Sequence, residues 1–166
     1  MNEIKNQTSV LFVCMGNICR SPAAEGVFHH YVEKAGYAGR INIDSAGTLG
    51  YHSGDPADSR MRQVALKRGY ALDSTARQVK HNDIDEFDLL VAMDLDNFRE
   101  LMSFTADRKD HIRMLGHFLD SGKDSSKVPS VPDPYYGGEE GFDRVLDMIE
   151  SACPLLLEYC KERLQP

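Results

Sequence analysis

One stretch near the amino terminus constrains this chain more than any other: the nine residues from Cys14 to Pro22, CMGNICRSP, which directly follow an apolar segment. That segment, Ser9 to Val13, is typical of a buried strand, and Pro22 is typical of the first turn of a helix. Backbone N–H groups in such a strand-to-helix turn point inward, and the helix dipole adds positive charge. The stretch therefore predicts an anion-binding loop with a thiol and a guanidinium at its two ends.

Phosphate is the anion that the composition of this loop suits best. Arg20 has a planar guanidinium that can hold two phosphate oxygens at once, and the loop amides supply further donors. The same positive charge favours the thiolate form of Cys14, which makes it a nucleophile. Gly16 lets the backbone approach an anion closely, and Asn17 is a residue type that tolerates a left-handed conformation. The loop thus predicts phosphoryl transfer through a cysteinyl-phosphate intermediate.

Attack by a thiolate on a phosphate ester expels an alcohol, and a general acid speeds this step by about 10²–10⁴-fold. Asp133 is the best candidate, because Pro132 and Pro134 restrict the backbone on both sides of it. The adjacent Tyr135 and Tyr136 form an aromatic wall that suits a flat aromatic substrate. Two other interpretations stay open: Asp133 is a turn-forming residue, and the tyrosines belong to the core.

Strand and helix patterns alternate along the 166 residues, which favours a parallel sheet. Strands are predicted at 8–14, 41–43, 87–93 and 112–115, and helices at 22–35, from 59 to 68, from 94 and from 139. Pro154 predicts a kink or a restart in the last helix, and residues 120–130 predict a loop without periodicity. We expect one α/β domain over residues 1–166, with a four-stranded parallel sheet flanked by helices on both faces and the phosphate-binding loop after the first strand.

Charge and composition exclude several classes of protein. The formal net charge of −7 argues against broad binding to nucleic acid or to anionic membranes. No apolar run reaches membrane-spanning length and residues 1–7 carry no apolar core of a signal peptide, so we expect a cytoplasmic protein. Cys153 and Cys160 lie seven residues apart in a helical pattern, which predicts buried thiols rather than a disulfide framework. The histidines show no metal-ligand spacing, so neither a metal nor a cofactor is expected.

Three motifs together resemble the low molecular weight protein tyrosine phosphatases: Cys14 to Pro22, the run Asp44-Ser45-Ala46-Gly47, and the run Asp133-Pro134-Tyr135-Tyr136. They occur in the family's order, and the resemblance covers almost the whole chain. It implies that Cys14 is the nucleophile and Arg20 the phosphate clamp. It also implies that Asp133 protonates the leaving phenolate and then activates water, with phosphotyrosine in proteins as the substrate.

The same resemblance implies supporting roles. Ser21 would hydrogen-bond the Cys14 sulfur, Asn17 and Ser45 would brace the loop, and Asp94 would steady Arg20. The residues implied to bind phosphate or substrate are Met15, Gly16, Asn17, Ile18, Cys19, Ser21, Tyr51, Tyr135 and Tyr136.

Four interpretations stay open beside these roles. Asp94 is either a support for Arg20 or a helix N-cap, and Ser45 either braces the loop or merely ends a strand. Cys19 is either a resolving thiol that traps oxidised Cys14 as a disulfide or a small apolar filler. Many family members carry a histidine where this chain has Ser74, which leaves the role of Glu25 open between a buried network and a first-turn charge.

Three other functions compete with phosphotyrosine hydrolysis. An arsenate reductase of this fold needs further cysteines, and none lies between Cys19 and Cys153, so only a variant that uses glutathione or glutaredoxin fits. A protein-arginine phosphatase tends to carry threonine where this chain has Ile18. A phosphate-dependent binding module would need neither the thiol nor the acid. We expect a monomer or a weak homodimer, and substrates with basic residues beside the phosphotyrosine because the chain is acidic.

Overall fold

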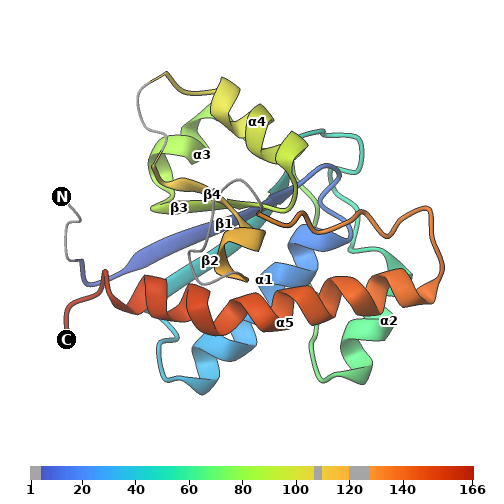
Figure 1. The fold of residues 1–166 in the computed structure, drawn as a ribbon, viewed down its shortest axis with the longest axis horizontal. Helices are drawn as coiled ribbons and strands as arrows, with labels where there is room; N and C mark the ends of the chain where they lie inside the picture. Colours follow the sequence, from blue (N-terminus) through green and yellow to red (C-terminus); the bar gives the residue numbers. More distant parts are fainter. Residues whose placement is uncertain (1–4, 107–109, 120–127) are drawn as a thin grey trace.

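The centre of the structure is a four-stranded parallel sheet with the strand order β2-β1-β3-β4 (Figure 1). This computed structural model describes residues 5–106, 110–119 and 128–166. The strands are β1 (Thr8–Cys14), β2 (Ile41–Gly47), β3 (Leu89–Ala92) and β4 (Ile112–Met114). The predicted four-stranded parallel sheet is confirmed, with boundaries that differ by a few residues at three of the strands.

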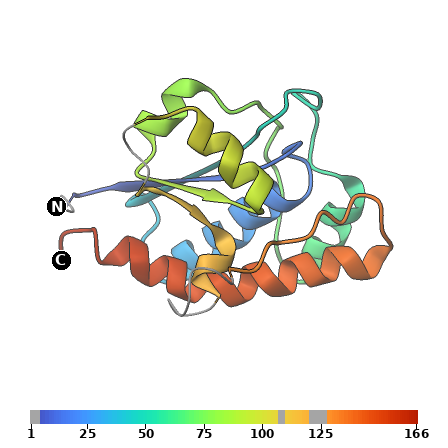
Figure 2. The ribbon, with the colours of Figure 1, turned by 45° about the horizontal axis from the view of Figure 1, so that its top comes forward.

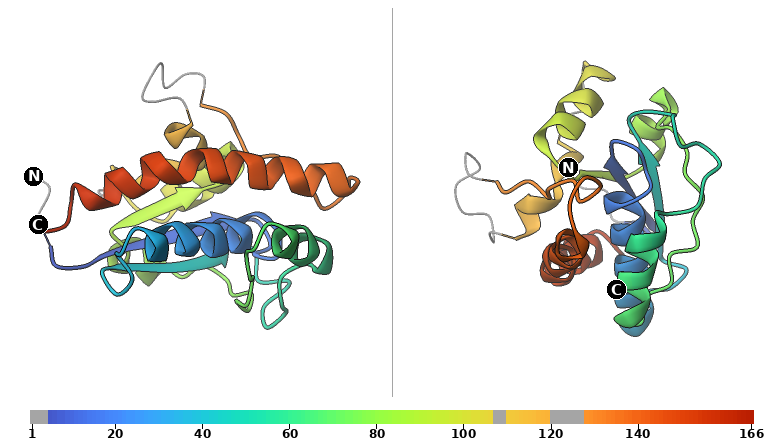
Figure 3. Two further views of the ribbon diagram at one scale, coloured as in Figure 1. Left: turned by 90° about the horizontal axis from the view of Figure 1, so that it is seen from below. Right: turned by 90° about the vertical axis from the view of Figure 1, so that its right-hand side faces the viewer.

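Helices cover both faces of the sheet, as a view along the layers shows (Figure 3). One face carries α1 (Arg20–Lys34), α2 (Ser59–Lys67) and α5 (Glu139–Lys161), and the other carries α3 (His81–Glu86) and α4 (Leu95–Ser103). Alternate residues of β1 enter the two cores: Val10 and Phe12 pack beneath α1 and α5, whereas Leu11 and Val13 pack beneath α3 and α4. Because β1 is buried on both faces, it is apolar throughout its middle, as central parallel strands are.

The topology places the end of β1 at a crevice. β1 lies between β2 and β3 and pairs with both, so the chain leaves β1 toward one side of the sheet and later returns to the other. Ligands of open α/β sheets bind at such switch points, outside the carboxyl ends of the strands. Cys14 is the last residue of β1 and lies opposite Gly47 of β2. Figure 2 shows the turn after β1 at the edge where the segment before α5 also passes.

Three local expectations differ from the structure. α1 begins at Arg20 rather than Pro22, because proline lacks only an N–H that a first turn leaves unpaired in any case. The expected restart at Pro154 is wrong: α5 is one 23-residue helix through that proline, with buried residues on both sides of it. The short α3 was not predicted, since six residues carry too little periodicity.

Two further segments complete the comparison with the sequence. A 3₁₀ turn (η1) at Leu115–Phe118 follows β4, and residues 128–130 form no regular structure. The rest of the predicted loop, residues 120–127, lies outside the described residues. Cys153 and Cys160 are both 1% exposed in α5, as predicted, and burial raises the pKa of the Cys160 thiol to about 12. Within the described ranges, no helix is long and apolar enough to cross a membrane.

Arg68, at the end of α2, is expected to contribute measurably to stability. Its guanidinium contacts three carboxylates on successive turns of α5: Asp143 at 2.9 Å, Asp147 at 2.9 Å, and Glu150. Alanine at this position leaves the three carboxylates to repel one another, which we expect to cost about 1 kcal/mol. The melting temperature, followed by circular dichroism, should fall by about 2–4 °C.

The matched control is Lys67→Ala, which removes the neighbouring cation of α2. The Lys67 side chain is 72% exposed and, among the residues that the structure describes, pairs with Glu139 alone, at 3.3 Å. We expect no measurable shift of its melting temperature, because exposed single pairs contribute little. Equal shifts for the two variants would show that the three-carboxylate contact adds nothing specific.

Candidate active site

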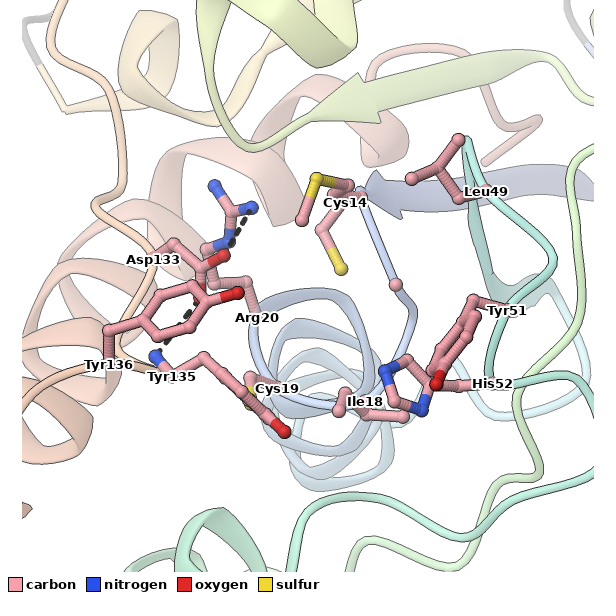
Figure 4. A pocket seen from close by; sticks show the side chains of 12 residues that line it. Cys14, Ile18, Cys19, Arg20, Leu49, Tyr51, His52, Asp133, Tyr135 and Tyr136 are labelled. Atoms are coloured by element: carbon pink, nitrogen blue, oxygen red, sulfur yellow. Dashed lines mark hydrogen bonds and ion pairs between the residues drawn. The ribbon is translucent and has the colours of Figure 1, made fainter.

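A cleft of about 380 Å³ opens at the carboxyl end of β1 (Figure 4). Three segments line it: the loop after β1, the loop after β2, and the segment before α5. Its lining residues are Cys14, Met15, Gly16, Ile18, Cys19, Arg20, Leu49, Tyr51, His52, Asp133, Tyr135 and Tyr136. The cleft therefore brings together the three predicted catalytic residues and most of the residues expected to bind a substrate, whereas Asn17 and Ser21, also expected to bind phosphate, are buried and do not line it.

The loop between β1 and α1 has the backbone geometry of an anion site. Asn17 is the one non-glycine residue among those described with a left-handed conformation, at φ 58°, and Cys19 is the N-cap of α1. The Cys19 side chain makes no capping hydrogen bond, so it does not compete for the first-turn amides of α1. Gly47 of β2 supports the loop closely, since a Cβ there would lie 2.7 Å from the Met15 carbonyl oxygen and 3.1 Å from the Asn17 nitrogen.

Two hydrogen-bonding groups lie beside the Cys14 sulfur. Its Sγ lies 2.9 Å from Ser21 Oγ and accepts from the Asn17 backbone N–H at 3.3 Å. Ser21 in turn accepts from Asn17 Nδ2 at 2.7 Å, and its hydroxyl hydrogen has two acceptors within reach, the sulfur and the Ala46 carbonyl oxygen at 3.5 Å. Ser21 Oγ and the Asn17 N–H thus both lie within hydrogen-bonding distance of the sulfur. Ser21 lies where the sequence predicted it.

A buried hydrogen-bond network holds Asn17 in its conformation. Asn17 Nδ2 also donates to Ser45 Oγ at 2.9 Å, and Asn17 Oδ1 accepts from the backbone N–H of Arg77 at 3.0 Å. Ser45 donates onward to Glu25. Burial raises the pKa of Glu25, against hydrogen bonds from Ser45 and Ser74 that lower it. Ser74 thus reaches the network in place of the expected histidine, and Ser45, inside β2, does more than end a strand.

Arg20 is 3% exposed and is fixed from two sides. Its Nη1 donates to Asp94 Oδ2 at 2.6 Å and to the Val131 carbonyl oxygen at 3.1 Å. Burial lowers the pKa of Arg20, but the negative charges of Cys14, Asp94 and Asp133 outweigh it and raise the pKa above its usual value. Both interpretations of Asp94 hold together, since its other oxygen caps α4 by accepting from the Asn97 N–H at 2.8 Å.

Asp133 lies across the cleft from the loop. Its Oδ2 is 3.7 Å from Arg20 Nη2, and its side chain is 33% exposed. Its Oδ1 accepts from the Tyr135 N–H at 3.1 Å, so Asp133 does form a turn. Its other oxygen, Oδ2, stays directed at the cleft. The backbone before Asp133 is anchored, since the Val131 N–H donates to the Met93 carbonyl oxygen at 2.8 Å.

Exposed aromatic side chains form the rim. Tyr51 is 88% exposed, Tyr136 87% and Tyr135 38%, and the last two rings meet edge to face at 5.0 Å. None of the three therefore belongs to the core. Figure 4 shows Tyr135 and Tyr136 on the side of Asp133 and Tyr51 on the opposite side. An aromatic ring entering between them would point its far end at the Cys14 loop.

Comparison with known proteins agrees with this geometry. The family model described as low molecular weight phosphotyrosine protein phosphatase matches residues 9–165 of this chain. The chain belongs to this family. A low molecular weight protein-tyrosine-phosphatase of Streptomyces coelicolor is 42% identical over 160 residues, 94% of this chain and 95% of that protein.

Solved structures give the same result for this low molecular weight phosphatase. A protein tyrosine phosphatase of Entamoeba histolytica, solved with Hepes in its active site, has a TM-score of 0.87 at 44% identity and covers 94% of this chain and 98% of its own. A Drosophila arginine phosphatase has a TM-score of 0.80 at 30% identity and covers 90% of this chain and 96% of its own. The resemblance that the motifs predicted is confirmed.

Cys19 of this phosphatase is a neutral thiol at ordinary pH. Burial raises its pKa to about 12, and the negative charges of Asp58, Cys14 and Asp133 act in the same direction. The side chain is 4% exposed, yet it lines the cleft together with Cys14. A resolving role for Cys19 stays a prediction.

Two residues of the phosphatase cleft were missed from the sequence. Leu49 is 53% exposed at the rim, and the His52 ring lies against Gly16, where a Cβ would approach it at 3.1 Å. His52 also faces Asp55, at 3.4 Å. Both lie in the glycine-rich loop after β2, and their closeness to Tyr51 in sequence was the available signal. Among the described residues, no three histidine, cysteine or acidic side chains are grouped to hold a metal ion.

Proposed function

We propose that this phosphatase hydrolyses phosphotyrosine in proteins, with Cys14 as nucleophile, Arg20 as phosphate clamp and Asp133 as general acid and base. The observation that carries the proposal is the arrangement around the cleft. The Cys14 sulfur lies at the floor of the cleft, where it accepts a hydrogen bond from the Asn17 N–H. The Asp133 carboxyl also faces the cleft, 3.7 Å from the Arg20 guanidinium. An aromatic rim above them suits a phenolic ester.

In the first half of the reaction the thiolate attacks phosphorus. An S–P bond forms at Cys14 while the bond from phosphorus to the phenolic oxygen breaks. Arg20 and the loop amides neutralise the charge on the equatorial oxygens, which are the groups that gain most from fixed donors. Asp133, protonated before this step, gives its proton to the departing phenolate.

In the second half water releases the phosphate. The Asp133 carboxylate now accepts a proton from water, whose oxygen attacks phosphorus while the S–P bond breaks. Ser21 Oγ, 2.9 Å from the sulfur, stabilises Cys14 as it leaves as a thiolate. Inorganic phosphate departs, and Asp133 is again protonated for the next cycle.

The test is turnover of a phosphotyrosine peptide in the presence of a chelator, with phosphoserine and phosphoarginine peptides alongside. Release from phosphotyrosine alone is the expected result. Release mainly from phosphoarginine would favour the function named for the Drosophila neighbour instead. Release from none, together with arsenate reduction in glutathione and glutaredoxin, would replace the proposal with arsenate reduction. Cys153 and Cys160, both 1% exposed in α5, offer no thiol relay at the surface.

Removal of the acid gives a separate prediction. Asp133→Asn should lower kcat/KM for a phosphotyrosine peptide by on the order of 10²-fold, because the phenolate then leaves unprotonated. The loss should be smaller for nitrophenyl phosphate, whose phenol is a better leaving group. Steady-state kinetics with both substrates measures the ratio. Asp96→Asn, an exchange in the first turn of α4, is the matched control and should leave both rates unchanged. An equal loss on the two substrates would assign the acid role to another group.

Four broader features belong to the same proposal. We place the whole activity in one domain over residues 1–166, acting as a monomer or a weak homodimer in the cytoplasm. With a net charge of −7, the phosphatase should favour substrates with basic flanks. Rates on acidic and basic phosphotyrosine peptides at low salt test this, and equal rates would contradict it.

A further inference from the structure

The amino-terminal end of α2 contacts two catalytic segments at once. Asp58, the N-cap of α2, donates its backbone N–H to the carbonyl oxygen of Ile18 in the phosphate-binding loop, at 2.7 Å. Its carboxylate accepts from the Arg60 backbone N–H at 2.8 Å, so the residue is fixed in the capping position. The start of α2 is therefore bonded to the loop that carries Cys14.

Arg60 extends this contact toward the general acid. Its Nε and Nη2 donate to the two Asp58 oxygens at 3.1 and 2.9 Å, the two-bond pairing that the guanidinium fork favours. Its Nη1 donates to the Tyr135 carbonyl oxygen at 3.1 Å. The Arg60 hydrogen bond lowers the pKa of Asp58, which keeps this carboxylate charged and the pair intact.

Two aromatic rings hold the Arg60 guanidinium in place. It lies 5.2 Å from the ring centre of Tyr135 and 4.8 Å from that of Phe142. Phe142 is fully buried at the start of α5, so this contact rests on a rigid part of the core. An arginine with a 45% exposed side chain is thus held by a carboxylate, a carbonyl and two rings.

The segment that carries Asp133 is consequently held by arginines on both sides of that residue. Arg20 donates to the Val131 carbonyl two residues before Asp133, and Arg60 donates to the Tyr135 carbonyl two residues after it. Between these two points Asp133 itself bonds the Tyr135 N–H. Loss of the Arg60 contact frees the Tyr135 side of this turn while the Val131 side stays bonded.

We propose that Arg60 is a positioning residue for the general acid: it sets the place of Asp133 over the phosphate-binding loop by joining Tyr135 to Asp58. The role rests on the proposed function of Asp133. Arg60 does not line the cleft and acts on the substrate only through the acid. Its loss should therefore impair the step that needs a proton and spare the binding of phosphate.

The experiment compares Arg60→Ala with Arg62→Ala, a cation of the same helix that donates to the Ala57 carbonyl at 2.9 Å. For Arg60→Ala we expect kcat/KM on a phosphotyrosine peptide to fall by about 10-fold, since displacement of a catalytic group by a fraction of an ångström is costly. On nitrophenyl phosphate the loss should stay within about 2-fold, because that phenolate needs little proton transfer. Inhibition by inorganic phosphate should be unchanged, and Arg62→Ala should match the wild type throughout.

A second variant and a double mutant keep the result decisive. Asp58→Asn retains an N-cap residue but weakens the paired hydrogen bonds, so it should show the same dependence on the leaving group. In an Asp133→Asn background, Arg60→Ala should cause no further loss. An equal loss on both substrates, or a further loss in that background, would overturn the inference and show a merely structural role. If the wild-type enzyme releases phosphate from neither substrate, it is the proposed function that fails.

Discussion

Replacement of Cys14 by serine should lower the rate of phosphotyrosine hydrolysis by about 10⁴-fold or more, as expected when a nucleophile is removed. A serine hydroxyl is far less acidic than a thiol, and the hydrogen bonds from Ser21 and the Asn17 N–H cannot make it ionise. Binding of a phosphotyrosine peptide should persist within a few-fold, because Arg20 and the loop amides remain. Single-turnover kinetics and fluorescence polarisation of a labelled peptide measure the two quantities.

Cys19→Ser is the matched control for this experiment. Cys19 lines the same cleft, but its pKa of about 12 leaves it uncharged, so its loss should change turnover only slightly. If Cys14→Ser kept more than a tenth of the activity, Cys14 would not be the nucleophile. A large loss in Cys19→Ser with little loss in Cys14→Ser would exchange their roles. The same pair of variants, treated with peroxide, tests whether Cys19 resolves oxidised Cys14.

The catalytic loop could be predicted from sequence because its parts are contiguous. Strand, glycine, asparagine, arginine and proline lie within fourteen residues, from Ser9 to Pro22, and each has a local conformational preference that agrees with the others. The left-handed Asn17 follows from that agreement, whereas the contact between Ser21 and the Cys14 sulfur was implied by the family resemblance. For Asp94 the sequence left two roles open as alternatives, and the structure shows both because its two carboxylate oxygens bond different partners.

The remaining parts of the site depend on contacts between distant residues. Arg60 is positioned by a hydrogen bond to a carbonyl oxygen 75 residues further along the chain, and no local sequence pattern distinguishes it from Arg62 or Arg68. Ser74 hydrogen-bonds Glu25, a residue much earlier in the sequence. The sequence showed that a histidine is missing at this position, but it did not show that Ser74 bonds Glu25 instead. Pro154 shows the same limit in the fold: the local preference for a break is outweighed by apolar burial along α5.

Arg20→Lys should lower kcat/KM for phosphotyrosine by about 10³-fold or more, within the range for arginines that stabilise a transferring phosphoryl group. Lysine keeps the charge but has one ammonium group, and Asp94 lies 2.6 Å from the present guanidinium. The lysine ammonium group pairs with that carboxylate and lacks the guanidinium fork that holds two phosphate oxygens. Affinity for inorganic phosphate, measured as competitive inhibition, should weaken in parallel.

A matched charge-conserving exchange separates this effect from general loss of an arginine. Arg77→Lys alters a guanidinium that pairs with Asp44 and Asp83, outside the cleft, while the backbone N–H that supports Asn17 is retained. Its kcat/KM should therefore stay within a few-fold of the wild type. A tenfold or smaller loss in Arg20→Lys would mean that charge alone suffices at this position. The large loss expected instead follows from geometry, because the Arg20 guanidinium bonds both the half-buried Asp94 carboxylate and the Val131 carbonyl oxygen through Nη1, which leaves its other nitrogens for the phosphate.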